Sequence, residues 1–242
     1  MSTNSSLLQI GALEVLVVRK PIKNLHLSVL PPDGKIRVSS PAHMKDDAIR
    51  TLISTRIPWI KKQRQKFSNQ ARQTERKYIT GESYYLFGDR YRLEVIEKNE
   101  VPKVILKGKS KIVLQTRPGT KMEKREEQML DWYRELLRPV LAGLFIKWQK
   151  KIGISPKSYS IKRMKTRWGT CGKESRRIWI NLELVKKPVE CIEYVVVHEL
   201  LHLIEKNHND RFTSSITKYL PKWHSTKEEL NRFILSYEKW GY

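Results

Sequence analysis

The segment VVVHELLHLIEKNH, residues 195–208, constrains the fold more than any other part of the chain. It contains two histidines four residues apart, His198 and His202, with Glu199 between them. On a helix this spacing places both imidazoles on one face, one turn apart, where they can bind a single zinc ion. On a strand the same side chains would lie about 13 Å apart, too far for one metal. The pattern therefore predicts a helix, although valine by itself favours strands.

The flanking residues indicate where this helix begins and ends. Pro188 suits a first helical position, and Glu190 favours the positive end of the helix dipole. We expect the helix to end near residues 206–207, because asparagine tolerates the left-handed conformation that terminates helices.

A catalytic zinc usually has three protein ligands and one open position for water. His208, six residues after His202, is the candidate third ligand; the alternative is an exposed histidine in a polar loop. The spacing of the three histidines is also used by metzincin proteases, but Glu205 stands where those enzymes have glycine, and no methionine follows His208. Glu199 is placed to take a proton from a water bound to the metal.

Three further segments make a family resemblance specific: Met164–Cys171 (MKTRWGTC), Ile178–Leu182 (IWINL) and His208–Phe212 (HNDRF). Together with the HELLH helix they resemble the YgjP-like metallopeptidases, a minimal zincin group with an HExxH active-site helix. The similarity is densest over residues 151–224 and weaker over residues 32–38 and 81–91. The SprT-type and WLM-type proteases are more distant relatives of the same kind.

The resemblance implies a zinc-dependent metallopeptidase that hydrolyses protein or peptide substrates. His198, His202 and His208 would be the metal ligands, and Glu199 the general base. Zincins commonly bind an extended peptide along a strand edge above the metal helix. The candidate for that edge is Trp179-Ile180-Asn181, and the alternative is an ordinary strand beside the core.

Other residues near the predicted site leave their roles open. Arg211, Tyr219 and His224 follow the third histidine and are candidates to stabilise a developing oxyanion, and the sequence does not choose among them. Cys171 is expected to be a packing residue, with metal ligation as the alternative.

The formal net charge of +23 is the second unusual property of the chain. Basic residues concentrate in Lys61–Lys77 and again in Lys157–Lys187, just before the metal helix. The second concentration contributes the candidates for polyanion binding: Lys162, Arg163, Lys165 and Arg167. The alternative is a solvated basic surface without a partner.

The charge keeps two other functions open. One is a metal-dependent nucleoside triphosphate (UTP) pyrophosphatase, a label that the YgjP-like family has carried. Against it, three histidines suit carbonyl chemistry, whereas phosphoryl chemistry usually recruits magnesium through carboxylates. The other is a nucleic-acid-binding module whose protease activity depends on DNA.

Hydropathy and turn residues predict an α+β protein with two domains. The expected domains are a β-rich N-terminal domain, residues 1–118, and a small zincin-like catalytic domain, residues 119–242. Strands are expected over residues 13–18, 25–30, 35–39, 84–95, 101–106 and 111–115, with a short strand pair between 159 and 184. Helices are expected over residues 46–67, kinked or broken at Pro58, and 122–149, interrupted at Pro139.

The remaining features exclude several classes of protein. No apolar stretch is long enough to span a membrane, and the N-terminus lacks the pattern of a signal peptide. Two cysteines, Cys171 and Cys191, do not indicate a disulfide framework, so a cytoplasmic location is expected. The sequence shows no internal repeat, and it does not indicate the oligomeric state.

Overall fold

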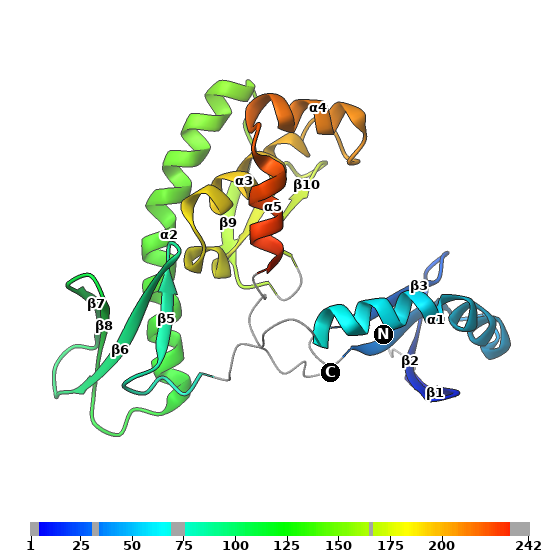
Figure 1. Ribbon diagram of the computed structural model, residues 1–242, viewed down its shortest axis with the longest axis horizontal. Coiled ribbons are helices and arrows are strands. Elements are labelled where there is room, and N and C mark those ends of the chain that lie inside the picture. Colours follow the sequence, from blue (N-terminus) through cyan, green and yellow to red (C-terminus); the bar gives the residue numbers. More distant parts are fainter. Residues whose placement is uncertain (1–4, 31–33, 69–75, 165–166, 233–242) are drawn as a thin grey trace. The chain divides into compact units, whose positions relative to one another are not determined.

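The computed structural model describes residues 5–30, 34–68, 76–164 and 167–232 (Figure 1). The chain forms two compact units, Met1–Gln73 and Thr74–Tyr242. Both combine strands with helices, which confirms the α+β class. The boundary expected at residues 118–119 lies instead inside the second unit, because the helix after it shares one core with the sheet before it. Among the described residues, no helix combines the length and the hydropathy needed to cross a membrane.

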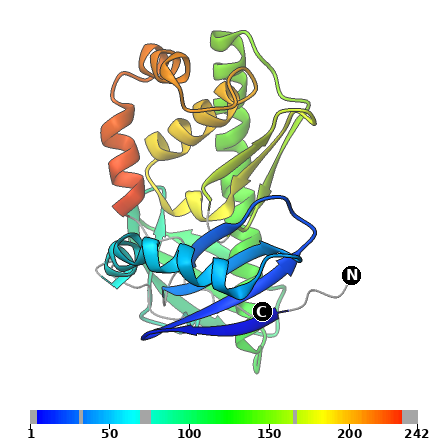
Figure 2. The ribbon, with the colours of Figure 1, turned by 90° about the vertical axis from the view of Figure 1, so that its right-hand side faces the viewer.

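The first unit is a sheet with one face covered by a helix (Figure 2). Its elements are β1 (Ser5–Ile10), β2 (Leu13–Lys20), β3 (His26–Leu30), β4 (Lys35–Pro41) and α1 (Asp46–Ser68). The sheet order is β1-β2-β4-β3. Ile49, Ile53 and Ile60 of α1 are fully buried against strand residues such as Val17 and Val38. Of the kink or break expected at Pro58, the break is wrong, because α1 continues through this residue.

The second unit begins with another sheet and a long helix. Its elements are β5 (Ser83–Leu86), β6 (Asp89–Glu97), β7 (Lys103–Lys107), β8 (Lys111–Thr116) and α2 (Met122–Ile152). The single strand expected over residues 84–95 is two strands, joined at Phe87 and Gly88, which both have positive φ (48° and 95°). Such a two-residue turn matches the right-handed twist of the strands that it joins. The expected interruption at Pro139 is also wrong, because α2 is continuous there and Leu137 and Leu141 on either side are fully buried.

These two sheets repeat one topology that the sequence did not reveal. The second sheet has the order β5-β6-β8-β7, with the same directions as the first: an antiparallel hairpin, a parallel central pair and a second antiparallel hairpin. A helix follows the fourth strand in both. The second hairpin of each turns at a glycine in the left-handed region, Gly34 (φ 66°) and Gly108 (φ 63°). The chain therefore contains two ββββα modules.

The remaining elements carry the predicted metal helix. They are β9 (Ser158–Lys162), β10 (Gly169–Gly172), β11 (Arg177–Asn181), the 3-10 helix η1 (Leu182–Lys186), α3 (Val189–Leu201), α4 (Asp210–Tyr219) and α5 (Trp223–Arg232). The strands form a sheet of order β10-β11-β9. The later turns of α2 hold this region: Phe145 stacks on Tyr159 of β9, and the Trp148 indole donates a hydrogen bond to Glu193 of α3.

Candidate metal centre

The three histidines of the predicted site come together at the end of α3. His198 lies in its last turn, His202 caps its C-terminus, and His208 follows on the turn before α4. The His198 Nε2 atom lies 3.1 Å from the Nε2 atoms of both His202 and His208. One ligand atom from each residue lies within 4.8 Å of the others, and this is the metal-binding group found among the described residues.

The helix ends earlier than the sequence predicts, and this early end shapes the site. After Leu201 the chain tightens into a turn, in which the amide of Ile204 donates to the carbonyl of Leu201. The Glu205 carbonyl thereby comes within 2.9 Å of His202 Nδ1. When His202 Nδ1 carries the proton and donates a hydrogen bond to this carbonyl, Nε2 is unprotonated and can bind a metal.

Phe212 packs against all three imidazoles, a role that the sequence did not reveal. Its buried ring lies 4.7 to 5.0 Å, centroid to centroid, from the rings of His198, His202 and His208. The Asn209 side chain accepts a hydrogen bond from the Phe212 amide and caps α4. The sequence signal that could have indicated this helix start is Asn209, a residue that favours helix caps, three residues before the apolar Phe212.

The arrangement fits a zinc ion. Two nitrogens bound to one tetrahedral zinc at about 2.0–2.1 Å lie roughly 3.3 Å apart, close to the observed separations of 3.1 Å. Burial lowers the pKa of His198 to about 3 and also lowers the pKa of His208. Both shifts favour the neutral imidazole, which is the form that binds metals.

Glu199 lies beside this cluster in a buried position. Burial raises the pKa of its carboxyl to about 8, and Arg167 opposes that shift. Its Oε2 atom is buried and has no hydrogen-bond partner among the described residues. A buried acceptor without a partner is expensive unless it serves a ligand or a water.

Gly169 of β10 makes room for Glu199. A Cβ atom at this position would lie 2.6 Å from Glu199 Oε1 and 2.7 Å from its Cγ. The strand backbone therefore passes directly over the carboxylate, which fixes where the carboxylate can point. Cys171 on the same strand is not part of the metal-binding group, and burial raises the pKa of its thiol to about 11.

The prediction that residues 179–181 form an open strand edge for a peptide is wrong. These residues belong to β11, which pairs with β10 on one side and with β9 on the other, so its backbone cannot accept a further strand. Ile180 is fully buried, and Trp179 remains partly exposed beneath the Lys162 ammonium. The outer strand of the sheet on the metal side is β10, which packs against α3.

Asn181 has an internal structural role. Its Nδ2 donates to the carbonyls of Met164 and Arg167, both at 2.7 Å. Its Oδ1 accepts from the amides of Met164 and Glu183, both at 3.2 Å. This fully buried side chain therefore anchors the segment that carries Arg167.

The candidates for polyanion binding are in different environments. Arg163 pairs with Glu126 at 2.8 Å and approaches the buried Glu183, so part of its charge is neutralised within the protein. Arg167 is exposed and acts electrostatically on Glu199. Lys162 is exposed, and Lys165 lies outside the described residues.

Of the three residues considered for oxyanion stabilisation, two make ring contacts with tryptophans. The Tyr219 ring lies edge-on to Trp148 of α2, and the His224 ring stacks on Trp223. Arg211 is exposed in the first turn of α4. Tyr194, which sequence reasoning missed, is buried with its ring 5.7 Å from that of His198, and burial followed by the Glu199 charge raises its pKa to about 12.

A comparison with known protein families identifies a match. The family model described as YgjP-like, metallopeptidase domain, matches residues 23–233, which reach into both units. The metallopeptidase zymogen abylysin of Pyrococcus abyssi is 17% identical with a TM-score of 0.35, over 37% of this chain and 90% of its own. The zymogen jannalysin of Methanocaldococcus jannaschii is 20% identical with a TM-score of 0.32, over 38% and 85%. A search of curated proteins finds no match.

Proposed function

The chain belongs to the YgjP-like metallopeptidase family, and on that premise we propose that it hydrolyses peptide bonds with a zinc ion and Glu199 as the general base. The convergence of the three histidine Nε2 atoms beside a buried carboxylate carries this proposal. His198, His202 and His208 would hold the zinc and leave one coordination position open.

Each residue of the site has a distinct task in this reaction. When bound, zinc lowers the pKa of water and polarises a carbonyl group. Glu199 Oε2 accepts the proton of the attacking water and then delivers it to the leaving amine nitrogen. Gly169 keeps the carboxylate in position, and Phe212 fixes the planes of the imidazole rings.

The substrate backbone would pair with β10. This strand is the outer one next to α3, and Glu199 lies under its first residue. An extended peptide added to β10 would gain main-chain hydrogen bonds, which do not depend on the side chains of the peptide. Because β10 spans only Gly169–Gly172, we expect low sequence selectivity and weak activity on generic unfolded protein.

The pyrophosphatase alternative has less support. Binding of magnesium and triphosphate normally requires carboxylate ligands. Among the described residues, the metal-binding group consists of three histidines and no carboxylate. The DNA-dependent protease remains compatible with the charge, and adding DNA to the protease assay tests it.

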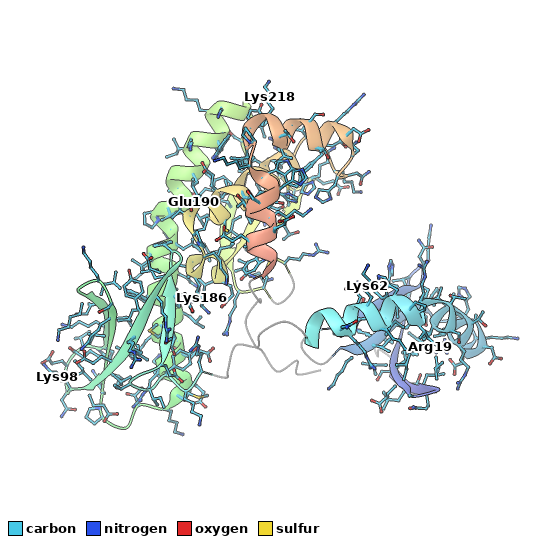
Figure 3. The ribbon with its side chains drawn as sticks, viewed as in Figure 1. Arg19, Lys62, Lys98, Lys186, Glu190 and Lys218 are labelled. Atoms are coloured by element: carbon cyan, nitrogen blue, oxygen red, sulfur yellow. The ribbon has the colours of Figure 1, made fainter. Side chains whose placement is uncertain are left out.

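The decisive experiment tests the metal, the general base and the substrate independently. Zinc content, cleavage of casein and cleavage of UTP, each with and without DNA, are measured for wild type and Glu199→Gln. The variant should keep its zinc and lose peptide cleavage, because the amide cannot take a proton. Glu190→Gln is the matched control: Glu190 lies exposed in the first turn of the same helix (Figure 3).

The third ligand is tested in parallel. His208→Ala should lower zinc retention strongly, whereas His224→Ala, an exposed histidine outside the cluster, should not. UTP cleavage that is lost in Glu199→Gln, with no proteolysis or self-cleavage under any condition, would replace the peptidase proposal by the pyrophosphatase alternative.

A further inference from the structure

A groove lies at the opposite edge of the metal-site sheet, along β9. Its volume is about 310 Å³, and it is lined by Tyr159, Ser160 and Ile161 of β9 and by Arg134 and Arg138 of α2. It shares no residue with the metal centre. The sheet order β10-β11-β9 separates the groove from β10 by one strand.

The strand side of the groove is an open edge. β9 pairs with β11 in parallel on its inner side, and no strand pairs with its outer side in the described part of the chain. An unpaired edge presents backbone amides and carbonyls that can bind an added strand. The Tyr159 ring is stacked on Phe145 at 4.0 Å between centroids, so the strand is held firmly against α2.

The helix side of the groove is positively charged. Arg134 and Arg138 are four residues apart on α2 and therefore project from the same face of it. Within the described ranges, Arg134 has one ion pair, with the exposed Asp131 of the preceding turn. Arg138 is exposed and has no ion pair among the described residues. Two guanidinium groups beside a strand edge match carboxylates carried by an extended chain.

We propose that this groove is an exosite for an extended acidic peptide segment, which adds to β9 as a further strand and places Asp or Glu side chains against Arg134 and Arg138. Assigning that segment to a protein substrate rests on the proposed peptidase function. The binding itself does not, because no residue of the groove belongs to the metal centre. The exosite would supply a selectivity for acidic stretches that the short β10 edge lacks.

Binding is tested on the full-length Glu199→Gln protein, which cannot consume the probe. The probes are fluorescent peptides that alternate Asp with Val, the same length alternating Lys with Val, and the acidic peptide with alternate backbone nitrogens methylated. The acidic peptide should bind, with an affinity that falls as salt rises. The basic peptide should not bind, and methylation should weaken binding at least tenfold, since it removes donors needed for strand pairing.

Charge reversal localises the site. The double variant Arg134→Glu/Arg138→Glu should weaken acidic-peptide binding at least tenfold. Arg138→Ala changes one exposed side chain, so it should weaken binding several-fold and leave the fold unchanged. Lys150→Glu is the matched control, because Lys150 is an exposed cation of the same helix outside the groove. In the active protein, the arginine variants should raise KM for a protein substrate with an acidic stretch and leave kcat unchanged.

The outcomes separate this proposal from the proposed function. Absence of peptide cleavage overturns the peptidase and leaves the binding result standing. No binding of the acidic peptide, equal loss in Lys150→Glu, or unchanged binding in both arginine variants overturns the exosite. Inorganic phosphate that displaces the acidic peptide at a lower concentration than acetate does, combined with insensitivity to backbone methylation, would overturn the peptide in favour of a phosphate ligand.

Discussion

The contact between Gly169 and Glu199 shows how one residue determines the geometry of the site. The carboxylate is buried and is confined by a strand backbone that leaves no space for a side chain. A general base works only within hydrogen-bond reach of the proton that it abstracts. The requirement for glycine therefore comes from the position of its neighbour, because its own backbone conformation lies outside the left-handed region.

We predict that Gly169→Ala lowers kcat/KM on the order of 100-fold while zinc content stays at the wild-type level, because a displacement of about 1 Å is enough for such a loss. The measurement combines peptide cleavage with metal analysis. Gly143→Ala is the control: Gly143 lies in α2 with nothing within 4 Å of an added Cβ, so the same change should leave activity intact. Wild-type activity in Gly169→Ala would show that Glu199 tolerates displacement.

Lys187 is a buried cation whose charge opposes folding. Burial, then repulsion from Lys186, lowers the pKa of Lys187 from 10.5 to about 8. Between pH 8 and 10.5 the unfolded chain binds more protons than the folded one, so this group makes the free energy of unfolding rise with pH. Below pH 8 the folded state carries the full cost of the buried charge, on the order of 3 kcal/mol.

We predict that Lys187→Met stabilises the metal-free protein by on the order of 1–3 kcal/mol at pH 7, and that the gain shrinks as the pH approaches 10.5. Urea unfolding followed by tryptophan fluorescence at pH 7 and pH 10 measures both values. Lys150→Met, at an exposed lysine, should change stability little at either pH. A gain of equal size at both pH values would contradict the lowered pKa.

At the scale of elements, the sequence predicted those parts of the site that follow from local geometry. The helix of His198 and Glu199 was predictable because only a helix brings both histidines to one metal. Its early end was not, because the turn from Leu201 to Glu205 is stabilised by its own backbone hydrogen bonds and by His202. The order β10-β11-β9 was not predictable either, because hydropathy does not say which strand is central.

The turn before α4 couples a helix cap to the proposed metal ligand His208. Asn209 follows His208 directly and caps α4, whose first turn carries Phe212. We predict that Asn209→Ala costs about 1 kcal/mol of stability. It should also weaken zinc affinity roughly 10- to 100-fold, the usual effect of losing a residue that orients a ligand.

Competition with a chelator measures the zinc affinity of these variants, and thermal unfolding measures their stability. Asn209→Asp and Asn209→Ser keep a side-chain oxygen that can accept from the Phe212 amide, so both should stay near wild type. If Asn209→Ala binds zinc as tightly as the wild type, the cap has no part in holding His208.

At the scale of the whole molecule, the two ββββα modules have different surroundings. In the second module, the later turns of α2 carry Leu141, Phe145 and Trp148 into the apolar core that also contains α3. In the first, α1 continues past Ile60 into Lys61, Lys62 and Arg64, which cannot form such a core. Figure 3 labels Lys62 on this part of α1. The repeat was hidden from the sequence because a shared topology needs only a shared hydropathy pattern, and the two modules differ in their other residues.

This division predicts what each unit can do alone. The buried residues form two separate apolar clusters, one in each unit, and every histidine of the metal centre belongs to the second. A domain with its own core can fold independently. We therefore expect the fragment 74–242 to fold, to bind one zinc with the affinity of the full-length chain, and to keep Glu199-dependent cleavage of short peptides.

Circular dichroism, zinc competition and peptide assays on the fragment and the full-length chain measure these three properties. A fragment that is unfolded or loses its zinc would show that the first unit completes the second, whereas loss of cleavage alone, with zinc retained, would assign the first unit a part in catalysis.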